Sequence, residues 1–412
     1  MAGVNVVGKN RRRVRSNQIL LVDYWLALAV AGLVVMGMLM VYSTTFDLGV
    51  LIYGEATYLI KRQLLALVLG LVGIALLLTV DYHVLRRWSV PALFGTLLLL
   101  GVVLFVGDEI FGARRGLFSG SIQPSELAKL AIILYIAHWL STKGDRIKDL
   151  TYGLMPFSVI TGLVCALIVL QPDVGTAALI AVISFTLFFI AGADLKQFAV
   201  AGGIGVGIFL ILVTMLPHAA ARIDSFWQAW RDPTQASWQV KQSVVALGTG
   251  GWFGVGLGES TQKFGPLPVA HTDGVFAILG EELGLFGCAL VMFMIAVLCW
   301  RGIRAALGAR DSYGFLLAIG ITFWLVFQSL IHIAVITASV PSTGMPLPFL
   351  SYGGTSLLIS LLGVGILLSI SRDASINVKV QRWKPIRESL RESINLRRRN
   401  GRAHFSGTGS RQ

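Results

Sequence analysis

Long apolar runs with few charges recur along the chain, separated by shorter polar segments. Each run is close to the roughly 20 residues that a helix needs to cross a bilayer. The runs are unbroken, whereas the strands of an outer-membrane barrel alternate between apolar and polar positions. The pattern therefore predicts ten membrane-spanning helices. They lie at residues 20–43, 63–80, 90–107, 124–141, 153–170, 174–192, 197–216, 275–300, 313–339 and 351–370.

The polar segment at residues 217–273, between predicted helices 7 and 8, is much longer than the others. Connections of this length are uncommon unless they are functional or disordered. This one is rich in aromatic residues, which argues against disorder: Trp227, Trp230, Trp238, Trp252 and Phe253. Since Trp collects at membrane–water interfaces, we expect a structured extracytoplasmic cap that lies on the lipid headgroups.

Composition narrows the protein class. Of the 412 residues, 55% are hydrophobic and only 13% are charged, whereas soluble domains carry about 25% charged residues. These values exclude a soluble enzyme, a disordered chain, a collagen-like fibre and a disulfide scaffold. The three cysteines lie inside apolar runs without ligand spacing and are expected to pack as core residues. The predicted fold class is an all-α polytopic membrane protein.

The distribution of basic residues predicts the orientation. If both termini are cytoplasmic, 25 of the 34 Lys and Arg residues lie in cytoplasmic segments and eight lie outside, as the positive-inside rule requires. The net charge of +13 then reflects the basic cytoplasmic segments of a membrane protein, and we expect no nucleic-acid partner. The predicted organisation is a basic N-terminus at 1–19, a membrane domain at 20–370 and a basic tail at 371–412. The tail fits either an interfacial helix or a disordered segment.

Ionisable groups at membrane depth are expensive and are candidates for function. Glu126 and Lys129 lie on one face of the fourth predicted span, either as a pair that merely permits insertion or as a pair that faces a polar cavity. Asp173 precedes the sixth span and either caps it or has a functional role. Glu281 and Glu282 point about 100° apart on a helix, so at least one must be buried and paired. Their role is either structural or catalytic.

Asp273 ends the long segment, at the outer surface where the eighth span begins. It either caps the helix and stays solvated, or accepts a proton from a hydroxyl of a lipid-anchored substrate. The last outer loop, residues 341–356, contains three prolines and three glycines. Irregular backbone near a bilayer is tolerated only when it is buried in protein or lines a cavity. We therefore expect this loop to pack at a cavity mouth beside the cap.

Seven motifs, in this order, resemble the SEDS family (shape, elongation, division and sporulation) of ten-span peptidoglycan glycosyltransferases. The resemblance covers residues 20–370. Ser-x-Gln-Lys ahead of His-Thr-Asp is closer to division-type (FtsW) members than to rod-elongation (RodA) members, whereas Gln171 leans the other way. The motifs are Gly112–Arg115, Gln123–Lys129, Gln171–Thr176, Gln242–Gly258, Ser260–Lys263, His271–Asp273 with Gly280–Gly284, and Pro346–Gly354.

The resemblance implies that the substrate is lipid II and that Asp273 matches the family's essential aspartate. Asp273 would act as the general base on the acceptor sugar hydroxyl, and undecaprenyl pyrophosphate would leave. The basic candidates for contacting pyrophosphate are Arg62, Arg114, Arg115 and Lys263. Glu126 and Lys129 match a polar pair in the family's central cavity, and His271 and Ser351 lie in matching motifs and are expected at the substrate.

The family also implies partners: a class B penicillin-binding transpeptidase, other divisome proteins and membrane lipid. It leaves open a divalent cation, Mg²⁺ or Mn²⁺, as a cofactor. Departures from the family pattern cluster at the expected site. An aromatic residue and an acid are missing at 266–269, Gly116 and Gly274 stand where Trp and Phe are common, and His332 stands where Asn is frequent. We expect His332 to be a neutral, hydrogen-bonded core group, or else a titrating one.

Two other functions fit the same pattern. A transporter that flips lipid-linked precursors also needs a polar cavity within many spans, but it gives no reason for an acid under an outer aromatic cap. A scaffold that only recruits a cell-wall synthase would not depend on Asp273. An elongation-type polymerase is the alternative within the family.

Overall fold

The computed structural model describes residues 23–110, 113–117, 122–232, 236–265, 267 and 270–374. Nearly all of this chain is helical. The predicted basic N-terminus at 1–19 and most of the tail at 371–412 lie outside the described residues. The helices that match the first five predicted spans are α2 (Tyr24–Tyr53), α3 (Tyr58–Thr79), α4 (His83–Val106), α5 (Pro124–Lys143) and α6 (Met155–Val169). The next two are α7 (Val174–Ile190) and α8 (Leu195–Met215).

The second part of the chain completes the bundle. α9 (Pro217–Arg231) and α10 (Trp238–Gly250) lie within the long polar segment, so much of its described part is helical. α11 (Val275–Leu307), α12 (Ser312–Ile336) and the C-terminal helix Gly354–Ala374 follow. Eight helices of the described chain are long and apolar enough to cross a membrane; α5 is not among them, and α7 is a shorter apolar helix. The fold is that of a multi-pass membrane protein.

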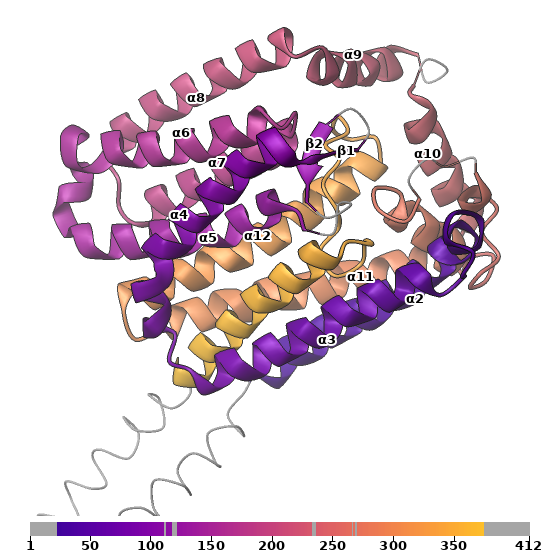
Figure 1. The fold of residues 1–412 in the computed structure, drawn as a ribbon, viewed down its shortest axis with the longest axis horizontal. Coiled ribbons are helices and arrows are strands. Elements are labelled where there is room, and N and C mark those ends of the chain that lie inside the picture. Colours follow the sequence, from indigo (N-terminus) through magenta and orange to yellow (C-terminus); the bar gives the residue numbers. More distant parts are fainter. Residues whose placement is uncertain are drawn as a thin grey trace, which may run out of the picture.

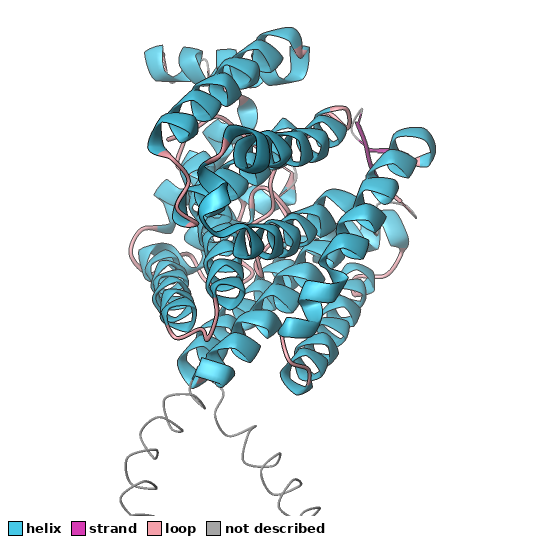
Figure 2. Ribbon diagram, turned by 90° about the vertical axis from the view of Figure 1, so that its left-hand side faces the viewer, coloured by secondary structure: helices cyan, strands magenta, loops and turns pink. Residues whose placement is uncertain are grey.

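The helices of the bundle differ in how deeply they are buried. α12 and the C-terminal helix are the most buried of the candidate spans, and Trp324 of α12 is fully buried. In contrast, α8 runs along the upper edge of the molecule in Figure 1 and exposes most of its side chains. Since apolar side chains are stable against lipid, this exposure is expected for a membrane helix. Figure 2 shows the molecule turned by 90°, and nearly all of the described chain is helix in this view as well.

α2 is ten residues longer at its C-terminal end than the pattern predicted. Thr44 and Thr45 lie in this extension, and their hydroxyls donate to the Met40 and Val41 carbonyls of the preceding turn. The helix satisfies these polar groups internally and continues through them. It ends at Gly54, whose φ of +69° is the left-handed conformation of a helix C-cap.

The one departure from an all-helical fold among the described residues is a short hairpin. Strands β1 (Asp108–Ile110) and β2 (Ala113–Gly116) pair antiparallel between α4 and α5. The pattern did not predict it, because two strands of three and four residues are too short to show an alternation. The hairpin places Arg115 at the end of the bundle that also carries α9 and α10 (Figure 1).

α11 is bent near its start. Gly284 has φ +64° and ψ −163°, which interrupts the helix. The chain between α10 and α11 pairs with this break: Leu285 N donates to Gly251 O at 2.9 Å, and Val255 N donates to Glu281 O at 3.0 Å. A side chain at residue 284 would clash with the backbone of Trp252 and Gly254, so only glycine fits here.

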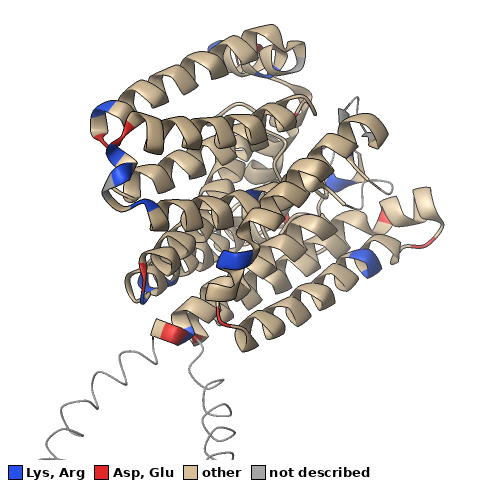
Figure 3. Cartoon of the chain, turned by 60° about the vertical axis from the view of Figure 1, so that its left-hand side comes forward, with Lys and Arg blue, Asp and Glu red and all other residues tan. Residues whose placement is uncertain are grey.

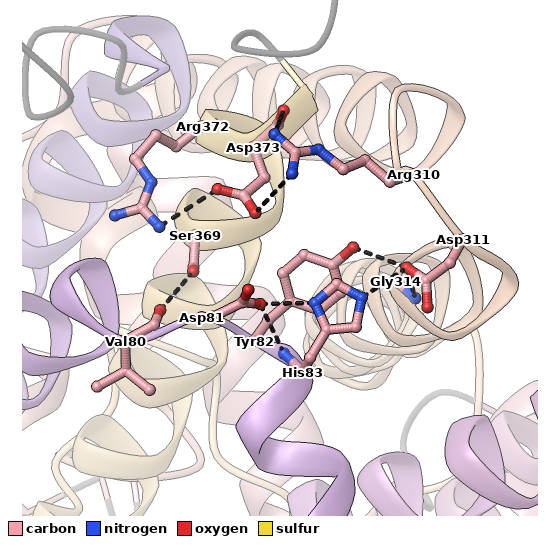
Figure 4. Close-up of polar contacts among 10 residues, drawn as sticks. All are labelled: Val80, Asp81, Tyr82, His83, Arg310, Asp311, Gly314, Ser369, Arg372 and Asp373. Carbon is pink, nitrogen blue, oxygen red and sulfur yellow. Dashed lines mark hydrogen bonds and ion pairs between the residues drawn. The ribbon is translucent and has the colours of Figure 1, made fainter. Parts of the chain in front are cut away.

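The described chain begins and ends at the same end of the bundle (Figure 1), and Ser371 Oγ donates to Asp23 Oδ2 at 3.4 Å. Figure 4 shows the polar contacts near this end. Tyr82 OH donates to Asp311 Oδ1 at 2.7 Å, and Ser369 Oγ donates to Val80 O at 3.3 Å. Charged side chains gather mainly at the two ends of the helices (Figure 3), so the apolar middle of the bundle can lie in the hydrocarbon core.

Candidate functional site

Asp273 lies at the end of the bundle opposite the termini, two residues before α11 begins. Its side chain is partly buried and faces the backbone of Gly344 in the last loop. A Cβ atom at Gly344 would lie 3.9 Å from Asp273 Oδ2. Gly344 has φ +69°, a left-handed conformation that glycine adopts without strain. The loop at 341–356 therefore packs beside Asp273, as the sequence predicted.

Arg222 of α9 approaches this loop at the same residue as Asp273 does. Its Nη1 donates to Thr343 O at 3.2 Å, and a Cβ atom at Gly344 would lie 3.6 Å from its Nη2. The Arg222 guanidinium and the Asp273 carboxylate thus approach the same point on the chain. Nothing in the sequence singled out Arg222 as a site residue.

Arg115 of β2 is a second guanidinium near Asp273. Its Nε donates to Gln171 O at 3.2 Å, and its Nη2 donates to Pro172 O. The adjacent Asp173 caps α7 by accepting a hydrogen bond from Thr176 N at 3.2 Å, so the capping interpretation of Asp173 is correct. The hairpin is therefore docked on the start of α7, with Arg115 held close to the site.

Burial raises the pKa of the Asp273 carboxyl above its ordinary value. Positive charge on His332, on Arg222 and on Arg115 opposes this effect, and the Asp173 carboxylate adds to it. A carboxyl with a raised pKa is a stronger base than an exposed one once it has lost its proton. Asp273 is thus suited to accept a proton, and it loses this capacity as the pH falls through its pKa.

An apolar cavity of about 520 Å³ opens beside the two guanidinium groups. Arg115, Arg222 and Thr343 contribute to its lining. Most other lining side chains are apolar and come from α7, α8 and α12, including Leu179, Val182, Phe209, Val213, Phe327 and Ile331. The cavity thus combines a cationic part, near Asp273, with an apolar part that extends between the helices.

The loop beside Asp273 is fixed to α12 by two side chains one helical turn apart. Gln328 Nε2 donates to Pro346 O at 2.8 Å. His332 Nδ1 lies 2.9 Å from Met345 O and, because a carbonyl oxygen only accepts, it is the donor. His332 is therefore hydrogen-bonded and buried, as expected. The two bonds hold the backbone that follows Gly344.

Ser351 joins the same loop to the residues before Asp273. Its Oγ donates to Thr272 O at 2.7 Å and accepts from Leu347 N at 2.8 Å. Tyr352 N donates to His271 O at 2.9 Å. Ser351 is buried, so the structure gives it a role in holding Asp273; its predicted contact with substrate stays a prediction.

We expect Ser351→Ala to lower the free energy of unfolding by about 1–3 kcal/mol, because it leaves the buried Leu347 N–H without an acceptor. Thermal unfolding of the purified protein in detergent measures the change. The control is Ser225→Ala, which removes only a bond to Ala221 O within the exposed part of α9. Equal unfolding temperatures for the two variants would show that Ser351 does not stabilise the loop.

The predicted pair of Glu126 and Lys129 is present and fully buried. Lys129 Nζ donates to Glu126 Oε1 at 2.7 Å and to Gln328 Oε1 at 2.9 Å, and it lies 5.4 Å from the centre of the Trp324 ring. Gln328 connects this pair to the loop at Pro346. The pair lies outside the lining of the apolar cavity, so a direct contact with substrate stays a prediction.

Lys263 is also held inside the protein. Its Nζ lies 3.0 Å from Glu282 Oε1, and it donates to Ser43 Oγ at 3.0 Å. Glu281 accepts hydrogen bonds from Ser260 and Thr261. Both glutamates are buried and paired, and they tie the segment at 258–263 to α11. The structure thus places Lys263 in an ion pair with Glu282, and its predicted contact with pyrophosphate stays a prediction.

The remaining predicted residues lie around the site. The His271 ring packs against Tyr352, with ring centres 5.8 Å apart, and burial lowers its pKa. Arg62 lies over the Tyr58 ring in the first turns of α3, and its charge acts on Tyr352. The Arg114 backbone pairs with Glu109 in the hairpin, and its side chain lies outside what the structure describes.

The described residues contain no group of three or more His, Cys, Asp or Glu side chains that could hold a metal ion. Arg222 and Arg115 lie near Asp273 instead, and their positive charge repels cations. The divalent cation that the resemblance leaves open stays a prediction.

Two features of the site lacked a distinct signal in the sequence. Arg222 belongs to an amphipathic helix, and nothing in the pattern of α9 indicates that its guanidinium reaches the loop at Thr343. The approach of Gly344 to Asp273 depends on a left-handed backbone in a loop that lies 71 residues further along the chain. The glycines and prolines of that loop indicated irregular backbone, but not its partner.

Comparison with known proteins shows the family of this chain. The family model described as "Cell cycle protein" (FtsW, RodA and SpoVE) matches residues 24–376. The chain is 40% identical over 353 residues to the probable peptidoglycan glycosyltransferase FtsW of Trichlorobacter lovleyi, covering 85% of this chain and 93% of the relative. It is also 40% identical over 354 residues to stage V sporulation protein E of Bacillus subtilis, covering 85% and 97%.

The fold is similar to that of a solved chain described under "Structural coordination of polymerization and crosslinking by a peptidoglycan synthase complex". The TM-score is 0.69 at 29% identity, over 86% of this chain and 98% of that chain. The relatives agree with the predicted resemblance, including its division type. This chain belongs to the FtsW/RodA/SpoVE family of cell cycle proteins.

Proposed function

We infer that this chain is a peptidoglycan glycosyltransferase, and we propose that it polymerises lipid II with Asp273 as the general base. The enzyme class follows from the FtsW relatives and from the likeness to a peptidoglycan synthase complex. One observation carries the site: the Asp273 carboxylate and the Arg222 guanidinium both approach Gly344, and Arg222 and Arg115 line an apolar cavity there. A lipid-linked pyrophosphate has both the charge and the apolar chain that this arrangement suits.

In the proposed reaction, the acceptor sugar hydroxyl gives its proton to an Asp273 oxygen as its own oxygen attacks the anomeric carbon of the donor. The bond between that carbon and the pyrophosphate oxygen breaks, and the bonding electron pair leaves with undecaprenyl pyrophosphate. Attack from the side opposite the leaving group inverts the anomeric carbon. Arg222 and Arg115 stabilise the negative charge on the leaving group. The apolar cavity receives part of the polyprenyl chain.

We propose that the chain crosses the cytoplasmic membrane ten times, with both termini in the cytoplasm. The eight long apolar helices, together with α5 and α7, account for the ten spans. The chain begins and ends its described part at one end of the bundle, which supports an even number of crossings. The excess of Lys and Arg in the segments on that side supports a cytoplasmic location. Asp273, α9 and α10 then lie on the outer face.

We propose a class B penicillin-binding transpeptidase as the partner, together with other divisome proteins. The similar solved complex is a peptidoglycan synthase that coordinates polymerization and crosslinking, and crosslinking is transpeptidase chemistry. The 40% identity to FtsW supports a role in cell division. Depletion of this protein in living cells would distinguish the two roles. Filamentous cells would indicate a role in division, and rounded cells would indicate a role in elongation.

The deciding experiment measures polymerisation and flipping in one preparation. The purified protein and its transpeptidase partner are placed in liposomes with fluorescent lipid II, and glycan strands are resolved on a gel while lipid access from each leaflet is followed by quenching. We expect strands that lysozyme digests. Flipping without strands would contradict the proposal and support the transporter, and the absence of both would support a scaffold.

We expect Arg222→Gln to lower kcat/KM for lipid II about tenfold to a hundredfold, because hydrogen bonds to charged groups contribute about 1.5–3 kcal/mol. Initial rates at several lipid II concentrations measure the change. Arg231→Gln, which removes the same charge at the far end of α9, is the matched control. A loss of equal size in both variants would mean that overall charge, and not the place of Arg222, sets the rate.

A further inference from the structure

His332 has a nitrogen whose role the fold does not explain. Its Nδ1 donates to Met345 O at 2.9 Å, so Nδ1 carries a proton. Nε2 is buried and has no hydrogen-bond partner among the described residues. An Nε2–H in this position would be a buried donor without an acceptor, which is costly. The resting ring is therefore neutral, with a lone pair on Nε2.

The place of the ring connects it to Asp273. His332 holds the carbonyl of Met345, the residue that follows Gly344. Gly344 is the point at which Asp273 Oδ2 and the Arg222 guanidinium meet the loop. Gln328, one turn earlier on α12, holds the next carbonyl, that of Pro346. Loss of the His332 hydrogen bond would release the Met345 backbone. Because Met345 directly follows Gly344, this shift would change the position of the loop that faces Asp273.

His332 and Asp273 also interact through charge. A proton on His332 stabilises the Asp273 carboxylate and makes it a weaker base. The other charged groups near the pair come from several elements: Arg222 of α9, Arg115 of β2, Asp173 before α7, and Glu126 with Lys129 of α5, which Gln328 joins to α12. His271, two residues before Asp273, is a further titratable group.

We propose that His332 is a positioning residue of the transfer reaction and a second proton-binding group of its site. Its Nδ1–H fixes the Met345 carbonyl beside Asp273, and Nε2 must be free of a proton for Asp273 to act as a strong base. This inference rests on the proposed function. It predicts that activity at low pH depends on two protons, one on each side chain.

Two substitutions separate the two roles of the ring. His332→Asn keeps an N–H donor at the position of Nδ1 and removes Nε2. His332→Leu removes both. Because the asparagine can still hold Met345 O, it preserves the loop, and its folding is checked by thermal unfolding in detergent. His138→Gln, which removes an imidazole of α5 that bonds to Ser89 and lies outside the proposed site, is the control.

The measurement is kcat/KM for lipid II polymerisation against pH, with each variant scaled to its own plateau. On the acid side, we expect the wild-type and His138→Gln rates to fall about a hundredfold per pH unit, and the His332→Asn rate to fall about tenfold. We expect His332→Leu to lower the plateau itself at least tenfold. Two results would overturn the second proton site. One is a His332→Asn rate that falls with pH as steeply as the wild-type rate, and the other is a wild-type rate that falls only tenfold per pH unit.

An unchanged plateau in His332→Leu would overturn the positioning role. Failure of the proposed function gives a different result. In that case the wild-type protein makes no polymer, or Asp273→Asn polymerises at the wild-type rate, whatever the pH profiles show. The Asp273→Asn variant is therefore run in the same series.

Discussion

Asp273→Asn is expected to lower the rate of lipid II polymerisation about 10²- to 10⁴-fold, the range that general-base catalysis contributes. Asparagine has nearly the shape of aspartate but cannot take a proton from the acceptor hydroxyl. Since Asp273 lies beside Gly344 and near Arg222 without capping α11, the substitution leaves the fold intact. Glycan strands on a gel, at several enzyme concentrations, measure the effect.

The matched control is Asp224→Asn, the same change at an exposed carboxylate of α9. It is expected to keep the wild-type rate. Asp273→Glu keeps the carboxylate but moves its oxygens by one methylene, and it is expected to retain a measurable part of the activity. Polymerisation by Asp273→Asn at the wild-type rate would show that another group takes the proton.

Lys129→Ala is expected to destabilise the protein by about 3–5 kcal/mol, since removing one partner of a buried ion pair leaves the other charge uncompensated. Glu126 and Lys129 expose 1% and 0% of their side chains. Loss of Lys129 also takes a hydrogen bond from Gln328, which holds Pro346. Thermal unfolding in detergent measures the loss of stability, and polymerisation at low temperature measures the effect on the loop.

Lys143→Ala, near the other end of α5, is the control and is expected to change stability by less than about 0.5 kcal/mol. The double variant Glu126→Gln with Lys129→Met leaves no buried charge and is expected to recover much of the stability. If Lys129→Ala unfolds no more easily than Lys143→Ala, the pair does not stabilise the core.

Much of the helical framework could be predicted from the sequence, because each membrane helix needs a long apolar run and the bilayer fixes its length. The errors occur at the helix ends. Lys61 and Arg62 lie in the first turns of α3, although the pattern placed them in a loop. A long basic side chain at a helix end can extend toward the polar interface, so its charge does not mark the boundary.

The candidate site was predictable only in part. Asp273 and Ser351 could be identified from the motifs in which they occur. The approach of Asp273 and Arg222 to Gly344 could not, because it brings together three segments far apart in the chain through contacts of side chains with loop backbone, which leave no pattern in the sequence. Lys263 had the charge and the side expected of a pyrophosphate contact, but the sequence did not reveal that Glu282 lies 3.0 Å from it.

The break at Gly284 has a mechanical consequence. The first turns of α11, which directly follow Asp273, share backbone hydrogen bonds with the segment at 251–256 across the break. The same segment also accepts hydrogen bonds from Leu285 N and Phe286 N, which lie after the break. It therefore connects the two parts of α11 where the helix itself is interrupted. A displacement of this segment would move the start of α11, and with it Asp273, relative to the rest of the helix.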